Sequence, residues 1–200
     1  MSTRTALFWK CQARPDALLK HVLLRLQHDG LRLPEGPNLQ QKMLDRESGN
    51  FISGKSVEIV QWRDGAEFAE HWDGLSFRVD SLNALTVEIL TSPDGGVLML
   101  HEDERAYERQ RSSAHEATRW AGLLLAVWAA ASPEECLFPL DLAELPWTQW
   151  AQAVSLRRPN AELRITREPG SGTPPPGFNL FTLAAGGTML TSLPVKRAPA

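Results

Sequence analysis

Residues 113–131 read SAHEATRWAGLLLAVWAAA, and this stretch decides the expected fold. Ser113 and Glu116 have the spacing of a capping box, in which a serine at the N-cap and a glutamate three residues later satisfy unpaired N–H groups of a helix start. Apolar residues then recur at helical spacing, and every position from Trp120 to Ala131 is apolar. A helix that is apolar all round is covered on several sides, so we expect a central, buried helix here.

Strand-like segments follow one another on both sides of this helix. They are expected at 3–10, 57–63, 75–79, 84–91, 97–100 and 161–167, and in a closing hairpin around Gly186-Gly187. Asp94-Gly95, shortly before an apolar run, is a strong hairpin signal. Strands that run consecutively, without alternating with helices, indicate an α+β fold. We therefore predict a mostly antiparallel sheet, made of an N-terminal strand and helix, a central meander and a C-terminal hairpin, packed on the central helix.

The size of the chain is that of one domain. It has 200 residues, of which 42% are hydrophobic, and this is enough to bury a sizeable core. We expect a single α+β domain over 1–195 and a flexible tail over 196–200. Residues 31–56 are expected to be irregular, with a short helix around 39–44, and residues 134–146 are expected to form a loop.

Charge and hydropathy argue against several classes of partner. The net charge of −3 is spread along the chain, without the basic stretch that nucleic acids or anionic lipid surfaces require. The longest apolar run, 120–131, is shorter than the roughly 20 residues of a membrane span, and the N-terminus lacks a secretory-signal pattern. Two cysteines, Cys11 and Cys136, do not make a disulfide scaffold. A cytoplasmic protein without nucleic-acid or membrane partners is the expectation.

Residues 49–56, GNFISGKS, match the P-loop spacing G-x-x-x-x-G-K-[ST]. A P-loop needs a buried strand before it and a helix after it. Here a polar segment precedes the match and the strand-like run VEIVQW follows it. The context favours a surface turn between a loop and a strand, and nucleotide binding through Lys55 stays the less favoured hypothesis.

Metal and nucleophile patterns are equally weak. Glu67, Glu70 and His71 would share one face of a helix and could hold a metal, but a solvated acidic face is the commoner meaning of such a run. There is no G-x-S-x-G elbow, and Cys136 follows two glutamates, which would not activate a thiol. We therefore assign no catalytic residue, no metal and no cofactor.

An acidic segment flanked by tryptophans is the best candidate for a binding surface. Carboxylates can steer a basic partner and tryptophans can anchor it. The partner-binding residues proposed on this basis are Trp62, Asp64, Glu67, Glu70, Trp72 and Asp73. The favoured hypothesis is a non-enzymatic protein–protein interaction domain, such as a bacterial immunity-type protein that neutralises a toxin. The alternative is a small-molecule, nucleotide or metal-dependent enzyme with a pocket beside the central helix.

Overall fold

The fold is known from a computed structural model. It describes residues 2–9, 39–57, 73–78, 85–92, 95–131, 133–139, 161–168 and 172–196. The strands are β1 (Ser2–Trp9), β2 (Leu39–Asp45), β3 (Asn50–Val57), β4 (Gly74–Arg78), β5 (Thr86–Ser92), β6 (Gly95–Asp103), β7 (Glu135–Phe138), β8 (Leu163–Thr166), β9 (Asn179–Thr182) and β10 (Thr188–Thr191). The described helices are α3 (Glu104–Ser112) and α4 (Ala114–Ala131). The predicted α+β class with a mostly antiparallel sheet is confirmed.

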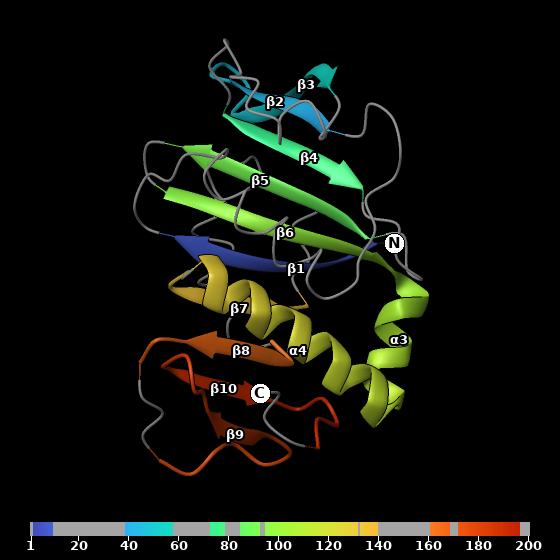
Figure 1. Cartoon of the computed structure of the whole chain (residues 1–200), viewed down its shortest axis with the longest axis vertical. Coiled ribbons are helices and arrows are strands. Elements are labelled where there is room, and N and C mark those ends of the chain that lie inside the picture. Colours follow the sequence, from blue (N-terminus) through green and yellow to red (C-terminus); the bar gives the residue numbers. More distant parts are fainter. Residues whose placement is uncertain are drawn as a thin grey trace.

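The ten strands form one sheet in the order β3-β2-β4-β5-β6-β1-β7-β8-β10-β9. Each pairing between neighbours is antiparallel. β3 lies at one end of the sheet and β9 at the other, while α4 crosses one face near the middle (Figure 1). The first strand of the chain, β1, therefore lies inside the sheet and joins the meander β2–β6 to the C-terminal strands.

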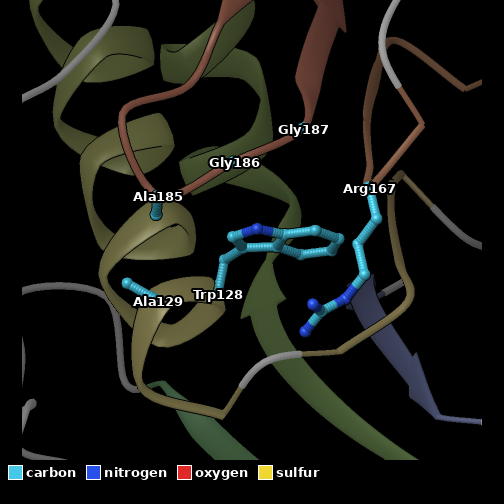
Figure 2. Close-up of a pocket in the computed structure, with 6 residues that line it drawn as sticks. All are labelled: Trp128, Ala129, Arg167, Ala185, Gly186 and Gly187. Carbon is cyan, nitrogen blue, oxygen red and sulfur yellow. The ribbon is translucent and has the colours of Figure 1, made fainter.

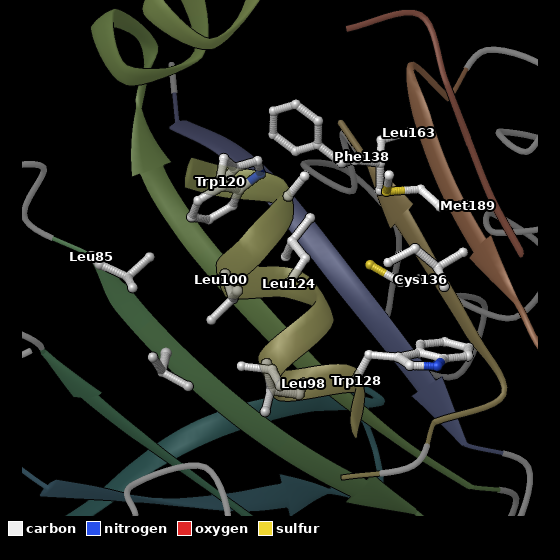
Figure 3. Packing of buried hydrophobic residues seen from close by; sticks show 14 of the residues in the cluster. Leu85, Leu98, Leu100, Trp120, Leu124, Trp128, Cys136, Phe138, Leu163 and Met189 are labelled. Atoms are coloured by element: carbon white, nitrogen blue, oxygen red, sulfur yellow. The ribbon is translucent and has the colours of Figure 1, made fainter. Parts of the chain in front are cut away.

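The main core fills the space between α4 and the sheet. Trp120, Leu124 and Trp128 of the helix pack with residues such as Leu98 and Cys136 of the sheet (Figure 3). Because side chains alternate between the two faces of a strand, we call the face with Leu98 the helix face. In the part of the chain that the structure describes, no helix is long and apolar enough to cross a membrane.

The opposite face of the sheet carries a second, smaller apolar cluster. Its buried members are Leu90, Val97, Met99, Leu137 and Ala161, against which Leu44 and Phe51 pack. Val97 and Leu137 are fully buried. Both faces of the central strands are thus covered, which explains why the four residues of β7, ECLF, are all buried.

The central helix predicted from residues 113–131 is confirmed as α4. Ser113 caps it: the amide of Glu116 donates to Ser113 Oγ at 3.4 Å. The reciprocal half of the capping box is not formed, because Ser113 N–H donates to the carbonyl of Arg109 and the Glu116 carboxylate pairs with Arg119. α3 precedes α4 directly, so the same serine also ends one helix and begins the next.

Three local expectations are corrected. Residues 39–45 form strand β2, where a short helix was expected around 39–44. β3 covers Asn50–Val57, most of which was expected to be irregular, whereas residues 58–63 of the strand expected at 57–63 lie outside the described ranges. β7 occupies part of the loop expected at 134–146. In each case pairing with neighbouring strands outweighs a weak local pattern.

Candidate functional site

The hairpin β2–β3 forms one end of the sheet, and its turn is held by Asp45. The Asp45 carboxylate accepts from the amides of Glu47 and Ser48 at 3.1 and 3.3 Å and from the Ser48 hydroxyl at 2.5 Å. These hydrogen bonds, led by the Ser48 hydroxyl, lower the pKa of Asp45. Gly49 closes the turn with a φ of 69° and donates to the carbonyl of Asp45. The turn is therefore well defined, although it is exposed.

An apolar pair is exposed on this hairpin. Met43 and Ile52 are direct partners in the β2–β3 register, and their exposed fractions are 45% and 51%. They are the large hydrophobic residues that are exposed among the described ranges. Residues 52–56 of β3 are all exposed, so both faces of this strand are open to solvent there.

A polar network ties the opposite face of the hairpin to the middle of the sheet. Lys42 Nζ donates to Ser53 Oγ at 3.2 Å and lies 3.8 Å from Glu88 Oε1. His101 Nε2 lies 2.8 Å from Glu88 Oε2. β4 has Gly74 in register with Lys42, so no side chain blocks the lysine as it crosses that strand. The contacts of Glu88 with Lys42 and with His101 thus link β2, β5 and β6.

A pocket of about 140 Å³ lies at the other end of the sheet. Its walls come from the last turns of α4, the end of β8 and the β9–β10 turn, and they consist of Trp128, Ala129, Arg167, Ala185, Gly186 and Gly187. The indole of Trp128 lies between the Gly186–Gly187 turn and the Arg167 side chain (Figure 2). Arg167 Nε donates to the carbonyl of Pro133 at 2.9 Å, just beyond the end of α4.

Most of the predicted partner-binding residues cannot be placed. Trp62, Asp64, Glu67, Glu70 and Trp72 lie outside the described residues, as does His71 of the metal hypothesis. Asp73 is half-buried, and its Oδ2 accepts from the Leu44 amide at 2.8 Å. This carboxylate thus joins the start of β4 to β2, at the same end of the sheet as the exposed pair.

The P-loop match does not form a phosphate cradle. Gly54, Lys55 and Ser56 lie within β3, the strand that pairs with β2. A P-loop would place the lysine and serine at the start of a helix. The expected turn is present at Gly49, but β2 precedes it in place of the expected loop.

A thiol nucleophile is also disfavoured at Cys136. Its side chain is fully buried, and burial, with a further contribution from the charge of Glu135, raises the pKa of this thiol well above its usual value. A thiol that stays protonated and inaccessible is inert. Among the described residues, no group of three or more His, Cys, Asp or Glu side chains is arranged to hold a metal.

Sequence reasoning missed the exposed pair and the pocket for different reasons. Met43 and Ile52 lie in segments without strand periodicity, so their pairing could not be foreseen. Arg167 ends a strand that was predicted, and Gly186-Gly187 was predicted as a turn, but their proximity to Trp128 depends on the tertiary fold. No protein-family model matches this chain, and no curated protein sequence matches it.

Proposed function

We propose that this chain is a non-enzymatic protein-binding domain whose partner docks on the β2–β3 hairpin. The observation that carries the proposal is the exposed cross-strand pair of Met43 and Ile52. Single exposed apolar residues are common on protein surfaces. Two that face solvent side by side, on the terminal hairpin of a sheet, make a small anchor around which an interface can be built.

The hairpin is held in place before any partner arrives. The Asp45 turn fixes one end, and the Lys42–Glu88 contact ties β2 to β5 across β4. A surface that is already ordered loses less conformational entropy on binding than a mobile one. This supports a docking role for the hairpin.

The partner we propose is a protein with a basic surface. The segment that joins β3 to β4 carries the predicted acids Asp64, Glu67 and Glu70. This segment leaves the sheet after Val57, the last residue of β3, and returns to it at Asp73, just before β4. β3 and β4 are the two strands that pair with β2. Carboxylates near an apolar anchor would speed association with a basic partner. Neutralisation of a toxin by a cytoplasmic, immunity-type protein is the specific form of this proposal.

The proposal is tested by substituting the two exposed residues. A partner is captured from the cells that express the chain, purified, and titrated against the full chain and the Met43→Glu and Ile52→Glu variants. We expect each variant to bind at least tenfold more weakly, because loss of an interface anchor costs about 2 kcal/mol or more. Circular dichroism checks that the variants are folded.

Leu180→Glu is the matched control, since Leu180 is a half-buried apolar residue on β9, the strand at the far end of the sheet. It should leave the affinity unchanged. Equal weakening by all three substitutions would refute the docking surface. The absence of any stoichiometric partner would refute the function itself.

A further inference from the structure

The connection from β8 to β9 is longer than the sheet requires. β8 and β9 both pair antiparallel with β10, which lies between them, so they run in the same direction. Returning along one short strand and crossing two strand spacings takes roughly 16 Å, which about five extended residues span. The chain uses the twelve residues 167–178. Its described part 172–178, GTPPPGF, lies outside the strands, at the end of the sheet formed by β9 (Figure 1).

The local sequence fixes the backbone of this segment. A residue that precedes a proline is restricted to extended or polyproline II conformations, and Thr173, Pro174 and Pro175 all precede a proline. A proline ring also holds φ at about −65°. Pro174 and Pro175 meet both conditions, so they adopt polyproline II, a helix with about three residues per turn and no internal hydrogen bonds.

A turn ends the polyproline segment. The amide of Phe178 donates to the carbonyl of Pro175 at 3.0 Å, which closes a turn over residues 175–178. Pro176 at the second position and Gly177, with a φ of 82°, at the third position match a type II turn. The hydrogen bond and the proline rings together hold the segment in one conformation.

Two of the three proline rings are presented to solvent. Pro174 is half-buried, whereas Pro175 and Pro176 are exposed. This pattern is expected where a helix with about three residues per turn rests one ridge on the domain and turns the others outward. Residues 172–178 carry no charged side chain. A partner would therefore recognise the shape and apolar surface of the rings, without ion pairs to this segment.

We propose that residues 172–178 are a docking segment for a domain of another protein, one with a groove lined by aromatic side chains. Such grooves bind proline rings in polyproline II conformation, and they exploit the low entropy of a segment that is already ordered. Gly177 stands three residues after Pro174, so the P-x-x-P spacing is absent. The partner we expect recognises consecutive prolines that are followed by a turn.

This proposal goes beyond the docking proposed on β2–β3 and does not depend on it. The proline segment leads into β9, at the opposite end of the sheet from β3. Met43→Glu, which tests the hairpin surface, should leave binding to the proline segment unchanged. Failure of one proposal would leave the other standing.

Competitive capture with the full chain tests the proposal. The immobilised chain and its Pro175→Ala/Pro176→Ala variant are each exposed to a lysate of the cells that express it. We expect at least one protein to bind the variant at least tenfold more weakly, as expected for loss of an interface anchor. The synthetic peptide GTPPPGF should displace this protein and, once the protein is purified, change its intrinsic fluorescence, because the proline rings enter an aromatic groove. High salt should weaken the binding by less than about threefold, since the segment is uncharged.

Two single substitutions are the matched controls. Pro194→Ala removes an exposed proline outside the run and should leave the binding unchanged. Pro174→Ala removes the half-buried ring and should weaken the binding less than Pro175→Ala or Pro176→Ala does. The proposal is overturned if the double variant captures the same proteins as the native chain, if the peptide neither displaces the protein nor changes its fluorescence, or if Pro194→Ala weakens binding as much as the double variant. It is also overturned if the protein lost is a second copy of this chain.

Discussion

Two glycines show where backbone packing dictates the residue. A Cβ on Gly187 would lie 2.2 Å from the carbonyl oxygen of Thr166, and a Cβ on Gly74 would lie 2.7 Å from that of Ile89. The φ of Gly187 is 95°, which side chains rarely adopt. Gly187 therefore meets both a conformational and a steric requirement, and it positions one wall of the pocket.

We expect Gly187→Ala to lower the free energy of unfolding by more than about 2 kcal/mol, because a left-handed backbone costs roughly 1–2 kcal/mol and the clash adds to it. Gly186→Ala is the matched control, with a φ of 85° and open space around the added Cβ. Gly186→Ala should lower the free energy of unfolding only by the cost of the left-handed backbone, because its added Cβ meets no clash. Chemical denaturation measures both variants, and equal losses would show that the contact with Thr166 does not constrain the turn.

At the scale of elements, Tyr107 connects helix α3 to Glu162, the residue just before strand β8. Its hydroxyl donates to Glu162 Oε1 at 2.7 Å, and its ring meets Phe138 edge-on at 5.6 Å. Arg111 lies over the ring and 3.4 Å from the same carboxylate. Burial, and then the hydrogen bond and charge of Glu162, raise the pKa of Tyr107 to about 12.

Tyr107 is the single tyrosine of the chain, so tyrosinate absorbance reports it alone. We expect a midpoint near pH 12 in the native protein, above the ordinary value of 10.0. Glu162→Gln should lower the midpoint without restoring 10.0, because the effect of burial remains. Since the native pKa is raised, this group stabilises the fold below pH 10 and loses that contribution as the pH rises toward 12.

Glu116→Gln is the control for this titration, because Glu116 pairs with Arg119. It should not move the midpoint. A native midpoint at the ordinary value, or one that is insensitive to Glu162→Gln, would contradict the proposed docking of α3.

Elements differed in how far they could be predicted, and the reason is physical. α4 was predictable because its signal is local: a cap at Ser113 and a continuous apolar run. β3 was missed because it is an exposed strand at the edge of the sheet with polar residues on both faces. β2 was missed because its buried positions include the polar Gln41 and its one exposed residue is the apolar Met43, so the apolar alternation of a strand is absent. β7 was missed because four residues buried on both faces show no alternation.

At the scale of the whole molecule, the order of the strands decides what can lie together. The pocket combines α4, β8 and the β9–β10 turn, and the Lys42 network spans β2 to β6. Residue type alone does not reveal these neighbours, because strand order is a long-range property. The candidate sites could therefore be recognised only once the sheet was assembled, whereas the fold class followed from the run of strands along the chain.

β1 joins the two halves of the sheet, and removing it should prevent folding. It pairs with β6 from Ser2↔Asp103 to Trp9↔Gly96 and with β7 over three further pairs. Deleting residues 2–9 would expose the inner edges of β6 and β7 and open the core beneath α4. A typical domain is stable by only about 5–15 kcal/mol, so this loss should exceed the stability available.

We expect the shortened chain to lose its near-ultraviolet circular dichroism and its cooperative thermal transition. Deletion of residues 197–200, which belong to the tail predicted over 196–200, is the control and should leave both unchanged. If the chain without residues 2–9 unfolds cooperatively in two separate transitions, the strands on either side of β1 are independent units, and the continuous sheet is not what stabilises the molecule.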